Sequence, residues 1–401
     1  MYLPATISGR PLGRRGTHLL PFGHHGDWMK RADYWINLLQ SMHMSWVVVQ
    51  SDSDSFYTSG AAHALLSAGI VPIVRFAYTF PYVWTHGEAT AQLVRLYEKF
   101  DVPCIVQFAN EPFDGRSWRK ETVPDYETAW GIIAQRWNEA AREIVNRGAI
   151  AGFPDGPCFA ENPFRRIEAT TDLWYDGNAV YLGHFYGKGR PLDYPYDEVT
   201  QKGVPLTMYQ YRADLDDFAN DPAWNEGQAV LDKMNAQRKA WASPGKTAID
   251  DDTCFNGWQK IVYWSRQAFG FDVPIAMTEG GWTPKDRAGS GGDITDIRWP
   301  MTTPKMVAKK TLAMYEADTP MFALCPWLLA AQDMGGEGWP DDCWVGYAYE
   351  YMYGREKPVV QTLQQNPPAD NKKGRIIALL KESQELLDKA QVLLDEIQKN
   401  H

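Results

Sequence analysis

The chain has 401 residues, of which 44% are hydrophobic and 22% charged, as expected for a globular protein. Its formal net charge of −10 argues against a nucleic-acid partner. No segment approaches the ~20 consecutive apolar residues that a membrane helix needs, so no membrane partner is expected either. The N-terminal MYLPATISGRPLGRRG lacks the apolar stretch of a secretory signal. We therefore expect either a cytoplasmic protein or a processed secreted one.

Short apolar runs with strand character alternate with helix-like segments along most of the chain. The expected strands are residues 17–22, 45–50, 70–76, 105–108, 149–153, 179–186, 273–279 and 321–329. The expected helices are residues 27–42, 60–68, 90–100, 126–147, 163–173, 225–241, 255–269 and 304–316. Eight strands that alternate with helices predict an α/β fold with a parallel sheet, closed as a (β/α)8 or TIM barrel. A doubly wound open sheet is the alternative, but its usual GxGxxG and P-loop signatures are absent.

Two segments stand outside this alternation. Residues 187–253, which follow the sixth strand, form an insertion that is either a binding wall or lid or a decoration of the barrel. After a barrel domain over residues 1–358, residues 359–374 are expected to be a polar linker. Residues 375–401 then form an amphipathic helix with leucine and isoleucine at heptad-like spacing. This helix either packs back on the barrel or self-associates, and we favour a homo-oligomer formed through residues 375–399.

Cysteine and aromatic residues set further limits. The five cysteines are widely spaced and form no CxxC pair, so neither a zinc site nor a disulfide framework is expected. Cys104 and Cys325 fall in apolar strand-like runs and are expected to be buried thiols, while one disulfide among the others is left open. The 17 Trp and 20 Tyr either fill a core or provide flat platforms for ligands such as sugars.

Two glutamates carry the chemical signal. The fourth strand ends abruptly at Asn110-Glu111-Pro112, where the proline forbids helical geometry at Glu111. A carboxylate at the end of a buried strand is either an ion-paired structural group or a catalytic acid. Glu279 ends the seventh strand in the same way, before two glycines. Barrel enzymes place catalytic groups at these strand ends, and glycoside hydrolysis needs two carboxylates that face each other across a pocket.

The sequence Asn110-Glu111-Pro112 after strand four, with Glu279 after strand seven, resembles the clan A retaining glycoside hydrolases over roughly residues 15–355. The resemblance implies that Glu111 is the acid/base, that Glu279 is the nucleophile and that Asn110 binds the sugar 2-hydroxyl. It implies cleavage of a β-linked glycan or glycoside with retention, a carbohydrate substrate and no cofactor. A catalytically inactive carbohydrate-binding barrel or assembly protein is the alternative.

The same resemblance implies accessory residues. His184 and Tyr186 on strand six would lie near the nucleophile, and Trp327 on strand eight would lie under the sugar. His184 is otherwise a core histidine, and Trp327 otherwise fills the barrel. The clan commonly has an arginine on strand two, where this chain has none. Either Arg75 on the third strand takes that role, or the strand count is off by one.

Other positions are weaker candidates. His24 and His25 either line the pocket mouth or form a turn. Residues 250–252 are three aspartates. They resemble a cluster of cation ligands, but we favour a solvated acidic run. No HxH or HExxH signature is present, so no metal site is expected. The tryptophans that follow strands seven and eight are candidate sugar platforms: Trp282, Trp339 and Trp344.

Overall fold

The computed structural model describes residues 3–19, 27–51, 55–76, 78–118, 123–155, 161–215, 227–283, 296–300, 302–327, 329, 344 and 358–368. The C-terminal segment 375–401 and its expected self-association lie outside these residues. Within the part of the chain that is described, no helix is long and apolar enough to cross a membrane.

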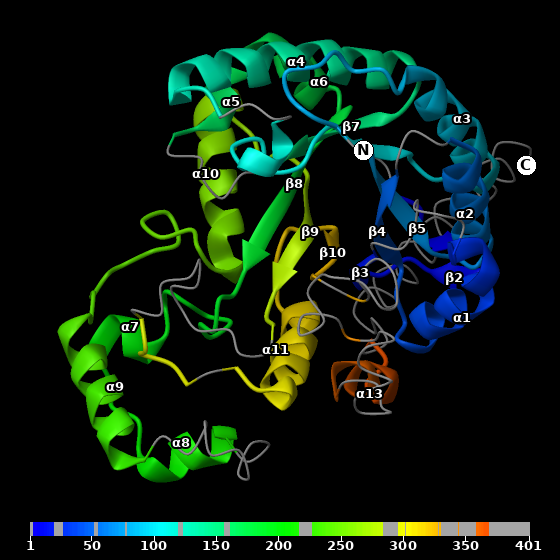
Figure 1. Cartoon of the computed structure of the whole chain (residues 1–401). Coiled ribbons are helices and arrows are strands. Elements are labelled where there is room, and N and C mark those ends of the chain that lie inside the picture. The colour runs from blue at the N-terminus through cyan, green and yellow to red at the C-terminus, as the bar shows by residue number, and fades with distance from the viewer. Residues whose placement is uncertain are drawn as a thin grey trace, which may run out of the picture.

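Eight parallel strands form a barrel in which each strand pairs with the next one in chain order (Figure 1). They are β3 (Gly16–Leu19), β4 (Trp46–Ser51), β5 (Val71–Phe76), β6 (Ile105–Gln107), β7 (Ile150–Pro154), β8 (Ala179–Tyr186), β9 (Ile275–Gly281) and β10 (Ala323–Leu324). The barrel closes between the last and first strands, because Leu324 N donates to Arg14 O (2.9 Å) and His18 N donates to Pro326 O (3.1 Å). The predicted (β/α)8 fold is therefore confirmed, and the open-sheet alternative is wrong.

Helices surround this barrel as an outer ring (Figure 1). They are α1 (Asp27–Ser41), α2 (Ser55–Ser67), α3 (Gly87–Tyr97), α4 (Tyr126–Asn146), α5 (Pro163–Arg166), α6 (Thr171–Tyr175), α10 (Trp258–Phe269), α11 (Pro304–Glu316) and α13 (Pro358–Gln365). Side chains fix where several of them begin: Asp125 accepts from Thr128 N at the start of α4, and Thr303 accepts from Met306 N at the start of α11. A two-stranded ribbon, β1 (Thr6–Ile7) and β2 (Arg10–Pro11), precedes the barrel.

Large aromatic residues fill the layer between strands and helices. Trp137 of α4 packs its ring against Phe108 and Phe153, at centroid distances of 6.0 and 5.0 Å. The largest fully buried side chains include four more tryptophans that flank the barrel or lie in its core: Trp46, Trp130, Trp174 and Trp282. Much of the unusual tryptophan content therefore stabilises the core, where each ring removes a large apolar area from water.

The cysteines that can be described are free thiols. Cys104 and Cys325 are buried, as predicted from their apolar surroundings, and Cys254 is buried as well. Burial raises the pKa of the Cys254 thiol to about 12, so it stays protonated. Cys158 and Cys343 lie outside the described residues.

The insertion after β8 contributes three helices that project beside the barrel at the lower left of Figure 1. They are α7 (Glu198–Lys202), α8 (Met208–Leu215) and α9 (Gln228–Ala240). Asp251 ties the base of the insertion together, because its carboxylate accepts from Lys246 Nζ (2.7 Å) and Tyr194 Oη (2.6 Å) and lies 3.4 Å from Arg190 Nη1. Asp251 therefore belongs to an ion-pair network, whereas its neighbour Asp250 is exposed, as expected of a solvated acidic residue.

The expected linker needs correction at its start. Residues 359–365 belong to helix α13, which packs against α11 (Figure 1). Val359, Val360 and Leu363 are buried at helical spacing, so this segment is part of the barrel domain. The glutamine-rich composition had suggested a linker, but these three apolar side chains outweigh it.

Candidate active site

Glu111 lies in a tight loop that follows β6. Its backbone φ is +32°, a conformation that costs a residue with a side chain about 1–3 kcal/mol. Three hydrogen bonds hold the loop in place: Asp114 N donates to Glu111 O (2.9 Å), Ser117 Oγ to Asn110 O (2.7 Å) and Trp118 Nε1 to Pro112 O (2.8 Å). The backbone at Glu111 is consequently held in place, and the residue is only 9% exposed.

Glu279 reaches the same space through a β-bulge in β9. Gly183 of β8 pairs with Met277, but the next residue, His184, pairs with Glu279, so Thr278 is an extra residue on β9. Such a bulge re-aims the side chain that follows it. Gly280 comes next with φ +135°, where a Cβ atom would lie 2.4 Å from the carbonyl oxygen of Phe185. The glycine is thus required by the close approach of the two strands.

His184 lies between the two carboxylates. Its Nδ1 atom is 3.0 Å from Glu111 Oε1 and 3.5 Å from Glu279 Oε2. One oxygen of each glutamate and a ring nitrogen of His184 all lie within 4.8 Å of one another. The two acids, distant in sequence, therefore face each other at short range in the barrel.

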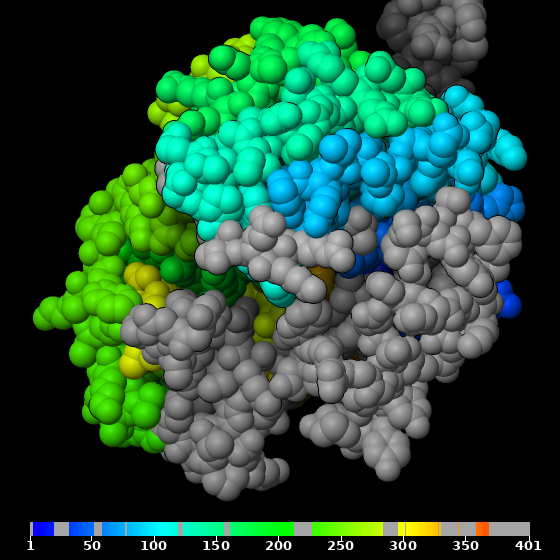
Figure 2. Space-filling view, turned by 45° about the horizontal axis from the view of Figure 1, so that its top comes forward, coloured from blue at the N-terminus to red at the C-terminus, as the bar shows by residue number. Residues whose placement is uncertain are grey.

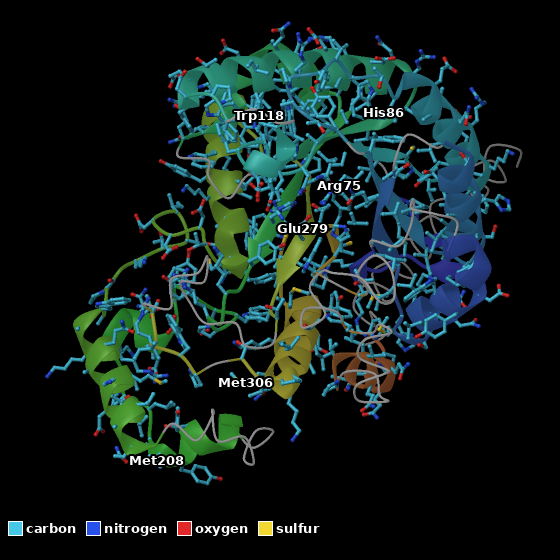
Figure 3. All side chains as sticks on the ribbon, in the orientation of Figure 1. Arg75, His86, Trp118, Met208, Glu279 and Met306 are labelled. Carbon is cyan, nitrogen blue, oxygen red and sulfur yellow. The ribbon has the colours of Figure 1, made fainter. Side chains whose placement is uncertain are left out.

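Glu279 has two further donors. Arg75 Nη1 donates to Glu279 Oε1 (2.5 Å), and Tyr186 Oη donates to Glu279 Oε2 (2.7 Å). Figure 3 labels Arg75 and Glu279 at the centre of the barrel, close to each other. Arg75 is on β5, the third barrel strand, so the strand count made from the sequence is correct and the arginine reaches Glu279 from strand three.

The charges of the site are set by burial and by these neighbours. Burial alone would raise the pKa of Glu279, but His184, Arg75 and His18 favour the ionised form and lower it to about 2. Burial likewise opposes protonation of His184, but the charges of Glu279 and Glu111 outweigh it and raise the His184 pKa. Burial raises the pKa of Tyr186 well above its ordinary value, so its hydroxyl remains a donor.

Two residues at the site were missed in the sequence. His18 on β3 is fully buried, with Nδ1 3.9 Å from Glu279 Oε1. A histidine inside an otherwise apolar first strand is the signal that could have identified it. Arg116 lies on the other side, with Nη2 3.5 Å from Glu111 Oε2, and Asp114 holds its guanidinium through two side-chain hydrogen bonds. Its side chain is 70% exposed, at the open end of the site.

The other residues that the sequence predicts to bind substrate are described in part. Trp327 is half-buried, and its ring packs edge-on against His18 at a centroid distance of 4.7 Å. Asn110 has a buried Oδ1 atom without a hydrogen-bond partner among the described residues. His24 and His25 lie outside the described residues.

Trp282 does not form an open platform, so this prediction is wrong. The residue is 1% exposed, and its indole Nε1 donates to Arg190 O (2.7 Å). A Cβ atom on Gly187 would lie 2.0 Å from that ring, so the backbone covers it closely. Trp344 is also buried, and Trp339 lies outside the described residues.

The face that carries the site is hollowed. Figure 2 shows recessed yellow atoms between a cyan and blue rim above and the green insertion at the left. Figure 3 places Trp118 above Glu279 and places Met208 of the insertion far from both. The loop after β6 therefore borders the site from above, whereas α8 lies away from it.

A cation is one ligand that the two glutamates and His184 could hold, since each offers a donor atom within 4.8 Å of the others. Protein donors already contact these oxygens, however. Arg75 and Tyr186 bind the two oxygens of Glu279, and the guanidinium of Arg75 places a fixed positive charge 2.5 Å away. The arrangement is therefore better suited to keeping a carboxylate ionised without a metal.

No protein-family model matches the chain, and no curated protein matches it. Solved structures with a similar fold include an endo-β-mannanase/endo-β-glucanase from Prevotella bryantii, with TM-score 0.43, 11% identity, 88% of this chain covered and 48% of that one. A β-glucuronidase from Parabacteroides merdae has TM-score 0.44 and 10% identity over 90% of this chain and 38% of its own. The cellulose synthase subunit Z from Clostridioides difficile has TM-score 0.42 and 12% identity over 88% and 99%.

This chain thus spans less than half of the first two structures and nearly all of the third. With TM-scores below 0.5, these similarities assign no activity to this chain.

Proposed function

We propose that this protein is a retaining O-glycosyl hydrolase that acts on a β-linked glycan or glycoside. The observation that carries the proposal is the short range between the carboxylates of Glu111 and Glu279, which have oxygens within 4.8 Å of each other. Retaining enzymes hold their two carboxyl groups about 5–5.5 Å apart, whereas inverting enzymes leave about 6.5–9.5 Å for a water molecule. An oxygen of each carboxylate within 4.8 Å of the other favours the shorter separation between carboxyl groups, and hence direct attack by one carboxylate.

In the first step, Glu279 attacks the anomeric carbon while Glu111 gives a proton to the departing glycosidic oxygen. The carbon–oxygen bond to the leaving group breaks as the ester to Glu279 forms. In the second step, Glu111 takes a proton from water, whose oxygen attacks the same carbon and expels Glu279 as a carboxylate. Two displacements at one carbon give net retention.

The neighbouring residues have separate tasks in this scheme. Arg75 and Tyr186 bind Glu279 and keep it ionised for attack. His184 Nδ1 contacts both glutamates, so a proton can pass directly between this nitrogen and the carboxylate of Glu111. Asn110 offers an unoccupied oxygen to a sugar hydroxyl, and Trp327 offers a partly exposed ring to the sugar face.

The test is a screen of the purified chain against β-linked glycans and aryl β-glycosides, with the anomer of the first product followed by NMR. We expect a β-product, and we expect Glu279→Ala and Glu111→Ala to lose activity by at least about 10³-fold with the fold intact. Glu168→Ala, an exposed glutamate outside the site, is the matched control. An inverted first product would exclude the double displacement, and oligosaccharide binding without turnover would favour the inactive carbohydrate-binding alternative.

A further inference from the structure

His18 occupies a position where an aliphatic side chain would be the ordinary choice. The neighbouring side chains Leu19 and Val48 are fully buried, and the imidazole itself is 0% exposed. Within the described part of the chain, neither ring nitrogen makes a hydrogen bond of good geometry, although the backbone of Thr278 lies close enough to favour the protonated ring. Burying a polar imidazole in this way is unfavourable, and a valine or leucine would avoid that cost.

The ring is directed at the nucleophile position. His18 Nδ1 lies 3.9 Å from Glu279 Oε1, the same oxygen that accepts from Arg75. Trp327 packs against the other side of the imidazole, edge to face with an interplanar angle of 83°. The tryptophan therefore limits how far His18 can turn away from Glu279.

The imidazole is held in its neutral form. Burial and the charges of Arg75 and His184 lower its pKa to about 3, although Glu279 and the backbone of Thr278 act in the opposite direction. These are the charged and titratable groups that act on it from β5, β8 and β9. A neutral imidazole can donate one N–H to a carboxylate but cannot deliver a proton to it at ordinary pH.

We propose that His18 is a positioning residue for Glu279, a neutral second donor that takes up Oε1 when the carboxylate shifts away from Arg75. This inference rests on the proposed function. A nucleophile must move toward the anomeric carbon to attack and must return as a carboxylate when it is expelled. At 3.9 Å the imidazole is too far from Oε1 for a hydrogen bond at rest, although it already favours the ionised form of Glu279, and it gains a hydrogen bond when the oxygen moves toward it. Part of its contribution is therefore present at rest, and the larger part is realised during the reaction.

The experiment compares His18→Leu, His18→Asn and His63→Asn in the full chain, using an aryl β-glycoside and the pH profile of kcat/KM. His63 lies exposed on α2 and is the matched control. For His18→Leu we expect kcat/KM to fall about 10- to 100-fold, the worth of a hydrogen bond to a charged group. We expect the acid limb of the profile to move to higher pH, because Glu279 loses a group that already favours its ionised form at rest. His18→Asn, which keeps an N–H donor, should recover much of both effects.

A loss of activity in His18→Leu with an unmoved acid limb would overturn the proposal and leave His18 as packing for Trp327. Equal defects in the leucine and asparagine variants would overturn it as well. A readout without substrate separates this outcome from failure of the proposed function. In the ¹³C NMR titration of labelled glutamate, assigned with Glu279→Gln, the Glu279 pKa should rise in His18→Leu and stay near the parent value in His63→Asn. If no glycoside is cleaved and this rise is still seen, the proposed function fails while the role of His18 stands.

Discussion

In the backbone ladder between β8 and β9, His184 is the partner of Glu279 next to the bulge. The Nδ1 atom of His184 lies 3.0 Å from Glu111 Oε1. The extra residue on β9, Thr278, is what brings Glu279 opposite His184 and not one position away. Without it, the alternation of side chains along a strand would direct the carboxylate to the other face. The facing of the two acids thus depends on one irregularity of a single strand.

The ionisation of Glu279 predicts a specific acid sensitivity. Its pKa falls from 4.5 to about 2 in the folded protein, so its contribution to stability is present above pH 4.5 and is lost as the pH falls toward 2. This contribution is on the order of 3 kcal/mol. We expect the free energy of unfolding, measured by urea titration between pH 5 and 2.5, to fall less steeply in Glu279→Gln than in the parent. Parallel curves would contradict the lowered pKa.

Tyr186 predicts a loss of rate without a loss of fold. Tyr186→Phe removes the hydroxyl that donates to Glu279 Oε2 at 2.7 Å and keeps the ring. Because a hydrogen bond to a charged group is worth about 1.5–3 kcal/mol, we expect kcat/KM on an aryl β-glycoside to fall about 10- to 100-fold and Tm to fall by only several degrees, with the fold intact. Tyr196→Phe, at an exposed tyrosine of the insertion, serves as the control and should keep full activity.

Substitution by alanine is expected to destabilise the protein at Gly280, which follows Glu279, but to stabilise it at Gly131, which lies in a helix. Gly280→Ala places a Cβ atom 2.4 Å from Phe185 O at φ +135°, so we expect it to destabilise the fold by more than about 2 kcal/mol and to displace Glu279. Gly131→Ala lies exposed on α4 with nothing within 4 Å of the new Cβ, and it should stabilise by about 0.5–1 kcal/mol. Chemical denaturation of both variants decides the point; a harmless Gly280→Ala would refute the strand contact.

Sequence periodicity was sufficient for the barrel, since all eight expected strands occur, although the eighth is limited to Ala323–Leu324. Strand ends also located Glu111 and Glu279, because carboxyl ends of parallel strands meet at one face. The pattern could not reveal the bulge at Thr278, which comes from pairing with β8. It also misplaced Trp282, because residue type does not tell on which side of a glycine-rich turn a ring will pack.

Asp251 predicts how the insertion is attached. Arg190, Lys246 and Tyr194 converge on its carboxylate and hold its pKa below the usual range. Asp251→Asn removes the charge that pairs these groups, so we expect a loss of about 1–3 kcal/mol in unfolding free energy and earlier proteolysis within residues 187–253. Asp250→Asn, at an exposed neighbour that only accepts from Thr247, should change little. Equal effects of the two substitutions would contradict the network.

The predicted self-association can be tested with a truncated chain, and the structure indicates where the truncation should be made. Helix α13 packs on α11, and Arg15 Nη1 donates to Asn366 O (2.7 Å), so removal from residue 361 would damage the barrel itself. A chain that ends at residue 368 keeps α13 and lacks the apolar stripe of residues 375–399. We expect light scattering to give a mass above one chain for the full-length protein and the mass of one chain for the truncated form, because an amphipathic stripe must be buried and we favour its burial against a second copy of the chain. Equal oligomeric states of both forms would remove this segment as the cause of assembly.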